Sequence, residues 1–222
     1  MVYVRLHDHF AEPLGTCGRM KVPSTQVLRK SWRCGRTERR TFVWFFVRSA
    51  RATAKPLQNY VRGLSPRSRY NRFLGAASEL PASELARALA ANGRDTLTLL
   101  LTSTVGARET VVGEARVALS CAERAGEFGM SIADDWRRLG AGSAVLEAIE
   151  RKSAADGIEF LFADTLRTNE AMIGLALGRG FRLEPGLEPR LVRIRKRLDD
   201  AAPDLPCQKW SEIADGVEHR AA

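Results

Sequence analysis

The sequence predicts an α/β (α+β) fold, because strand patterns and helix patterns alternate through its second half. Residues 126–132 alternate small or polar residues with apolar ones, as a half-buried strand does. Residues 144–152 have the apolar spacing of an amphipathic helix. A second strand pattern at 157–164 and a second helix over 169–180 repeat this order. The alternation indicates helices packed on a central sheet.

The remaining elements surround this unit in chain order. Residues 105–109 are expected to supply the turn between two strand patterns that can pair. Pro81 stands where a helix is expected to begin. Residues 190–197 place several arginines on one face, which is typical of a half-solvated edge strand whose charges resist aggregation. Strands are expected at 42–48, 95–102, 110–119, 181–183 and 190–197, and helices at 55–63 and 82–91.

A glycine-bearing turn joins the strand at 126–132 to the helix at 144–152. Gly140 and Gly142 carry no side chain at the place where backbone N–H groups point out of a helix N-terminus. Unpaired donors and the positive end of the helix dipole suit a phosphate there. The turn predicts a pyrophosphate-binding loop, although its spacing fits neither of the two better-known phosphate loops. The same turn also fits a helix start that binds nothing.

Two motifs carry a resemblance to a known family. The turn matches the pattern Arg/Gln-x-x-Gly-x-Gly/Ala at residues 137–142. A later pattern that runs from Asn to Gly-Phe is matched by Asn169 and by Gly180-Phe181. With these motifs, roughly residues 41–198 resemble the GNAT superfamily of acyl-CoA-dependent N-acyltransferases. The resemblance implies a mixed, mostly antiparallel central sheet of six or seven strands, flanked by about four helices, whose fourth and fifth strands splay apart.

The resemblance also implies where acetyl-CoA, the cosubstrate, would bind. In the family, pantetheine lies between the splayed strands and pairs with the edge of the fourth strand, as an added strand would. Asn169 would line the cleft, and its alternative role is that of a helix N-cap. No metal is expected. The cofactor-binding residues expected on this basis are Met130, Ser131, Ile132, Arg137, Arg138, Leu139, Gly140, Ala141, Gly142, Ser143 and Asn169.

A closer similarity concerns the acceptor. Residues 64–74 and 112–116 look like the GNAT domains of bacterial protein lysine acetyltransferases, some of which modify acyl-CoA synthetases. This similarity implies that an acetyl group moves from acetyl-CoA to a primary amine, by direct attack in a ternary complex. The amine would belong to a protein lysine, such as one on an acyl-CoA synthetase, or to a small molecule. Arg69 and Tyr70 are the candidate substrate-binding residues, and their alternative is a solvated helix start.

The expected general base is a carboxylate. An amine must lose a proton before it attacks, because a lysine ammonium has a pKa of about 10.4. The three histidines, His7, His9 and His219, lie outside the predicted core. Glu127 is the first candidate for the base, since the resemblance places a glutamate there. Glu114, on the neighbouring strand, is the second.

The sequence departs from the family at two positions. Many members carry a tyrosine, which protonates the leaving thiolate, where this chain has Ala176. Tyr70 or water would have to take its place. This departure keeps a non-catalytic acyl-CoA-binding sensor as an alternative function. Arg138 stands where many members carry glycine, which adds bulk at the turn.

The positive charge of the chain is unevenly distributed. The formal net charge is +9, and basic residues strongly outnumber acidic ones in residues 1–51. Pro and Gly interrupt the start of this segment. We therefore expect a basic, disordered extension over 1–40, a catalytic domain over 41–198 and a polar tail over 199–222. Nucleic-acid binding through the basic arm is a further alternative function.

The expected compartment is the cytoplasm. No apolar run approaches the roughly 18 residues of a membrane span, and no signal-peptide pattern is present. The four cysteines are widely spaced, which argues against a disulfide framework. A zinc site built from His7, His9, Cys17 and Cys34 would match no usual ligand spacing. The sequence makes no prediction of oligomeric state.

Overall fold

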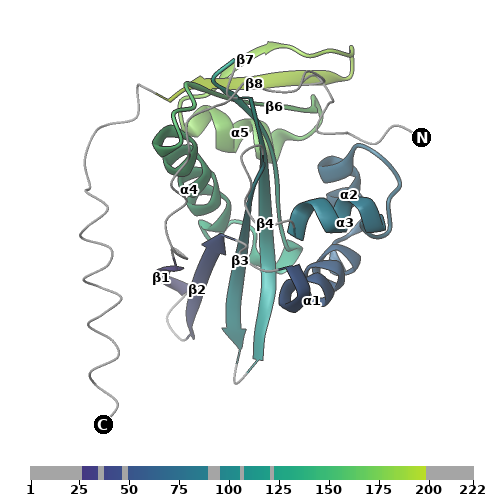
Figure 1. The fold of residues 1–222 in the computed structure, drawn as a ribbon, viewed down its shortest axis with the longest axis vertical. Helices are drawn as coiled ribbons and strands as arrows, with labels where there is room; N and C mark the ends of the chain where they lie inside the picture. The colour runs from purple at the N-terminus through teal and green to yellow at the C-terminus, as the bar shows by residue number, and fades with distance from the viewer. Residues whose placement is uncertain are drawn as a thin grey trace.

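The computed structural model describes residues 27–34, 38–46, 50–89, 96–105, 108–120 and 123–198. One mixed sheet runs through them in the order β1-β2-β3-β4-β5-β6-β8-β7 (Figure 1). Neighbouring strands are antiparallel except for β5 and β6, which are parallel. The strands are β1 Val27–Cys34, β2 Glu38–Phe46, β3 Thr96–Val105, β4 Arg108–Ser120, β5 Ala125–Ile132, β6 Phe160–Leu166, β7 Arg182–Pro185 and β8 Leu191–Arg197.

Helices cover both faces of the sheet, with α1, α2 and α3 on one side and α4 and α5 on the other (Figure 1). Among the described residues, no helix combines the length and apolar character that crossing a bilayer requires. The helices are α1 Ala50–Gly63, α2 Pro66–Phe73, α3 Ala82–Leu89, α4 Ala141–Ala155 and α5 Glu170–Gly178, with a 3-10 turn at Asp134–Trp136.

The central strand β3 is buried on both faces, which explains its nearly continuous apolar sequence. Leu99 packs into the larger core, together with Val117 of β4 and Ile149 of α4. Leu100, which points the opposite way, packs into a second core with Val61 of α1. Alternation along a strand sends neighbouring side chains to opposite faces. Two apolar layers therefore hold the helices on either side of one sheet.

The parallel pair β5 and β6 separates soon after it forms. Its ladder joins Ala125 to Phe160 and ends where Glu127 pairs with Phe162. Strand β5 nevertheless continues to Ile132, and β6 continues along β8 to Leu166. The two strands are the splayed fourth and fifth strands that the resemblance implied.

The predicted fold class is confirmed, with differences in the number of elements. The sheet has eight strands where six or seven were expected, and the described residues form five α-helices where about four were expected. The extra strand is β1, which lies in the segment expected to lack regular structure. The extra helix is α2, whose few apolar residues give no periodic stripe. Residues 1–26 and 199–222 lie outside the described residues.

Replacing Ile149 with alanine should destabilise the fold strongly. The side chain of Ile149 is 0% exposed in the larger core, so truncation leaves a cavity that costs about 2–5 kcal/mol. Leu177→Ala is the control, because Leu177 of α5 is 50% exposed and should change stability by less than about 1 kcal/mol. Urea unfolding of both variants measures the difference. Equal losses of stability would contradict the packing described here.

Candidate active site

Among the residues that the structure describes, no strand pairs with the side of β5 that β6 leaves after Glu127. The N–H of Ala133 donates to the carbonyl oxygen of Val112 at 2.8 Å, so the backbone of Ala133 faces β4. Successive residues of a strand direct their backbone groups to opposite sides. Because Ile132 and Met130 alternate with Ala133, their N–H and C=O groups face away from β4. These groups border the opening between the splayed strands, which is where an extended ligand could pair as an added strand.

The N-terminus of α4 lies next to this strand and has no side-chain cap within the described part of the chain. Gly140 is its N-cap, with a φ of 82° in the left-handed region that favours glycine. Arg138 also has a positive φ, of 57°, which explains why glycine would suit its position. Leu139 and Trp136 pack against the core and anchor the turn. The first N–H groups of α4 thus lack intrahelical acceptors and are available to an anion.

The start of α4 packs closely on β5 and α5. A Cβ added to Gly142 would lie 3.3 Å from Leu175 of α5 and 4.0 Å from atoms of Met130 and Ile132. The close approach brings the helix N-terminus beside the open edge of β5. Ser143, in the same turn, accepts a hydrogen bond from Arg179 at 3.4 Å.

The opposite face of β5 lies against α1 and α2. The Tyr60 hydroxyl donates to Ser131 Oγ at 2.9 Å. Burial and the nearby charge of Glu114 raise the pKa of Tyr60, which keeps this hydroxyl protonated as a donor. The guanidinium of Arg72 lies over Gly129, where an added Cβ would be 2.6 Å from Arg72 Nη1. Glycine at this position therefore makes room for an arginine.

Glu114 is the centre of a buried ion network beneath this face, and its carboxylate is 1% exposed. Its oxygens accept from Arg72 Nε at 2.5 Å, from Arg116 Nε at 3.1 Å and from Ser131 Oγ at 3.2 Å. Burial alone would raise the pKa of Glu114, but the charges of Arg72 and Arg116 outweigh it and hold this pKa below its ordinary value. A carboxylate that holds two guanidinium groups is poorly suited to accept a proton. This environment favours a structural role for Glu114 over that of a base.

Glu127 lies on the same face of β5, at the last residue that pairs with β6. Its side chain is buried, and its negative charge contributes to the raised pKa of Arg193. The larger cause of that raised pKa is Asp164, which accepts two hydrogen bonds from Arg193 at 2.8 and 3.0 Å. Glu127 thus stands at the root of the opening, on the side of the sheet that α1 and α2 cover in part.

The two predicted substrate-binding residues have neighbours of different kinds. The Arg69 guanidinium donates to the backbone carbonyl oxygens of Arg62 and Leu64, at the C-terminal end of α1. There it acts as a helix cap, which leaves it less able to bind a substrate. The Tyr70 hydroxyl is near Arg190 Nη1, at 3.4 Å, and the side chain is 41% exposed.

Asn169 and Ala176, the two residues of this region that the sequence analysis singled out, both have structural roles in α5. Asn169 is the N-cap, accepting from the Met172 N–H at 3.4 Å and donating to Thr165 Oγ1 at 3.0 Å. The capping alternative is therefore present in the structure. Ala176 is fully buried, so α5 supplies no acid at this position.

Sequence reasoning missed a polar cluster that joins the turn before α4 to α2. Arg137 contacts Asp134 and Ser68, and Asp134 also accepts from Ser65. One signal was available, because Ser65 followed by Pro66 is a typical helix start. The contact between Tyr60 and Ser131 could not be predicted from the sequence. Tyr60 stands on the apolar side of an amphipathic helix, where a tyrosine is usually only part of the core.

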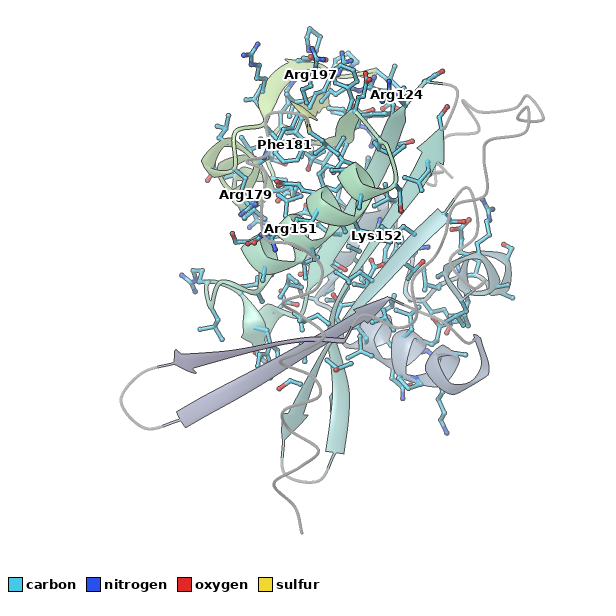
Figure 2. The ribbon with its side chains drawn as sticks, turned by 60° about the vertical axis from the view of Figure 1, so that its left-hand side comes forward. Arg124, Arg151, Lys152, Arg179, Phe181 and Arg197 are labelled. Carbon is cyan, nitrogen blue, oxygen red and sulfur yellow. The ribbon has the colours of Figure 1, made fainter. Side chains whose placement is uncertain are left out.

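The face covered by α4 and α5 carries basic side chains whose charges are balanced locally. Figure 2 shows Arg151, Lys152 and Arg179 on this side of the sheet. Because these cations are paired, α4 carries no stripe of unpaired positive charge. A nucleic-acid-binding surface typically has such a stripe. Arg151 pairs with Glu147, Lys152 with Asp156 and Arg179 with Glu150.

Glu114→Gln should destabilise the fold and weaken its response to acid. The change removes the counter-charge of the buried Arg72 guanidinium and leaves Arg116 paired with Glu84 at 3.5 Å, at a cost of about 3–5 kcal/mol. The folded-state pKa of Glu114 is below its ordinary value of 4.5, so the unfolded chain takes up the proton more readily. The wild type should therefore lose stability as the pH falls below that value, and the variant should lose less.

Urea unfolding at pH 7 and at acidic pH provides the measurement. Glu79→Gln is the control, because Glu79 forms an ion pair with Arg62 in which both side chains are about half exposed, at 48% and 57%. Such pairs contribute little to stability. If the two variants were equally stable, the structural role assigned to Glu114 would be contradicted.

Comparisons with known proteins agree with this geometry. The sequence model of the acetyltransferase (GNAT) family matches residues 72–181. A search of curated proteins finds no match. The GNAT domain of S. lividans PAT has a similar fold, with a TM-score of 0.63 and 22% identity over 71% of this chain and 90% of that one.

Two further solved structures share the fold. A GNAT-family acetyltransferase from Streptococcus pneumoniae gives a TM-score of 0.54 and 18% identity over 69% of this chain and 98% of that one. The ribosomal-protein-S5-alanine acetyltransferase from Vibrio fischeri gives a TM-score of 0.56 and 14% identity over 72% and 96%. The family match over residues 72–181, the matched motifs and the splayed strands support a GNAT N-acyltransferase, and the solved structures show the same fold.

Proposed function

We propose that this chain transfers the acetyl group of acetyl-CoA to a primary amine by direct attack in a ternary complex. The observation that carries the proposal is the separation of β5 from β6 beside the uncapped N-terminus of α4. An open strand edge suits the amides of pantetheine, and an uncapped helix start suits a pyrophosphate. The amine would approach from the other face of β5, where Glu127 lies.

The residues of the chain fit acetyl-CoA as a ligand. The backbone of Met130 and Ile132 offers donors and acceptors at the open edge of β5. The N–H groups of residues 140–143 offer donors to phosphate oxygens, and Gly142 lets this turn pack closely against Leu175 of α5. When bound, acetyl-CoA supplies the acetyl group as a reactive thioester.

Glu127 is the proposed general base. It would accept the proton that the ammonium of the acceptor loses, and the amine nitrogen would then be free to attack the carbonyl carbon. Its burial at the last residue of β5 that pairs with β6, where the two strands begin to separate, supports this role. A base positioned in this way typically contributes about 10²–10⁴-fold to the rate.

The backbone of β5 would stabilise the charge that develops on the carbonyl oxygen. A backbone N–H of Met130 or Ile132 is the proposed donor, because both face the open edge. Loss of one such donor costs about 10²–10³-fold in kcat in other enzymes. Water is the proposed source of the proton for the leaving sulfur, since Ala176 carries no acid and Tyr70 is engaged near Arg190.

The acceptor is proposed to be a protein lysine or a small amine. An acyl-CoA synthetase is one protein acceptor to try, given the similarity at residues 64–74 and 112–116. Nucleic-acid binding through the basic arm would depend on residues 1–40, of which 1–26 and 35–37 lie outside the described residues. The alternative function, a sensor that binds acyl-CoA without turnover, would bind CoA but release no thiol in the assay described next.

The first experiment measures release of free thiol from acetyl-CoA against a panel of amines and acyl-CoA synthetases, with Glu127→Gln alongside. We expect acceptor-dependent release that falls about 10²-fold or more in the variant, because the base is lost. The Kd for CoA, measured by calorimetry, should change little.

Glu123→Gln is the matched control, since Glu123 is exposed in the turn before β5 and should leave the rate unchanged. Binding of CoA without turnover on any acceptor would favour the sensor. Absence of CoA binding would overturn the proposal altogether.

Gly140→Ala should weaken CoA binding several-fold. Its φ of 82° is one that alanine adopts at a cost of about 1–2 kcal/mol, so the turn before α4 must distort. Gly174→Ala in α5 is the control, because an added Cβ there meets nothing within 4 Å and alanine favours the helix. Calorimetry with CoA and thermal unfolding separate the two effects. Unchanged affinity in Gly140→Ala would argue against the phosphate site at this turn.

A further inference from the structure

The guanidinium of Arg137 is directed toward α2. Its Nη2 donates to Ser68 Oγ at 2.6 Å, and its Nη1 lies 3.1 Å from Asp134 Oδ1. Both terminal nitrogens thus already have partners, although Arg137 opens the motif that was expected to bind the pyrophosphate. The contacts make a bridge between the turn before α4 and the first turn of α2.

Asp134 completes this bridge by capping α2 from outside the helix. Its Oδ2 accepts from the backbone N–H of Ser65 at 3.0 Å, and its Oδ1 accepts from Ser68 Oγ at 2.7 Å. Partial burial tends to raise the pKa of Asp134, but the hydrogen bonds from Ser65 and Ser68 and the charge of Arg137 lower it overall. The carboxylate is therefore charged at neutral pH, next to the positive end of the α2 dipole.

Helix α2 connects this bridge to β5, because it contacts the bridge at its first turn and β5 near its C-terminal end. Arg72, near its C-terminal end, pairs with Glu114 and lies over Gly129. The same helix carries Tyr70 on its exposed side. A continuous set of contacts thus runs from the turn before α4, through Arg137 and α2, to the acceptor face of β5.

We propose that Arg137 is a positioning residue, which with Asp134 and Ser68 couples the cofactor turn to α2 and so to the acceptor site. Under this proposal the pyrophosphate is held by the backbone N–H groups at the start of α4, and the Arg137 guanidinium is not a phosphate ligand. The inference rests on the proposed function, since it assigns a role within the same reaction.

A truncated donor distinguishes the two roles of Arg137. Acetyl-pantetheine carries the thioester but no phosphate, so a lost phosphate contact cannot affect its reaction. We expect Arg137→Ala, Asp134→Asn and Ser68→Ala each to raise the KM of the amine about tenfold, as loss of a charge-assisted hydrogen bond does. The increase should be the same with acetyl-CoA and with acetyl-pantetheine.

The control is Arg151→Ala, on the outer face of α4, which should change neither KM (Figure 2). An effect of Arg137→Ala confined to acetyl-CoA would overturn the inference and make this side chain a phosphate ligand. An unchanged amine KM in all three variants would also overturn it. Ser68→Ala keeps the test valid if the charged variants fold poorly.

Hydrogen exchange gives a readout that needs no turnover. CoA binding to the wild type should slow exchange at the backbone amides of α2, and Ser68→Ala should abolish that change while CoA still binds. If exchange in α2 did not respond to CoA in the wild type, the coupling would be refuted. A wild type that fails to bind CoA by calorimetry would instead refute the proposed function, so the two failures are distinct.

Discussion

One buried carboxylate, that of Glu114, ties three helices to one face of the sheet. It holds Arg72 of α2 directly, and it reaches Tyr60 of α1 through a serine hydroxyl. Arg116, its other partner, approaches Glu84 of α3 at 3.5 Å. Buried charges are costly unless they are paired, so each of these groups depends on the others being in place. The helices on this face, which border the proposed acceptor site, are thereby held by charge as well as by apolar packing.

In the proposed reaction, strand β5 would contact both substrates, because its two faces and its edge present different groups. Met130 and Ile132 pack their side chains toward α4, while their backbone groups face the opening. Glu127 and Ser131 alternate with them and lie on the other face, where Ser131 contacts Tyr60 of α1. Pairing with β4 fixes this arrangement, since a slip of one residue would exchange the two sets of side chains. The chemistry of the site thus depends on the register between β4 and β5.

The sequence was sufficient where a pattern is periodic or a motif is fixed. The alternation of residues 126–132 and the glycines at 140 and 142 predicted β5 and the turn before α4, and the structure has both. A helix start at Arg69 and Tyr70 was only an alternative interpretation, because arginines fill the positions where a stripe of apolar residues would reveal α2. The contacts of Arg137 and Glu114 were also beyond prediction, since a partner that lies far along the chain leaves no local pattern. Whether a charged residue is solvated or buried depends on that partner.

The pairing of β1 with β2 bears on how far this chain can be shortened. The two strands are joined along the full length of β1, from Val27 to Cys34, so β2 is an interior strand. Starting the chain at residue 41 would remove β1 and turn β2 into an open edge. The sequence of that edge, Phe-Val-Trp-Phe-Phe at residues 42–46, is apolar and rich in residues that favour strands. Such an edge is a template for pairing between molecules, so a shortened protein would tend to aggregate during expression.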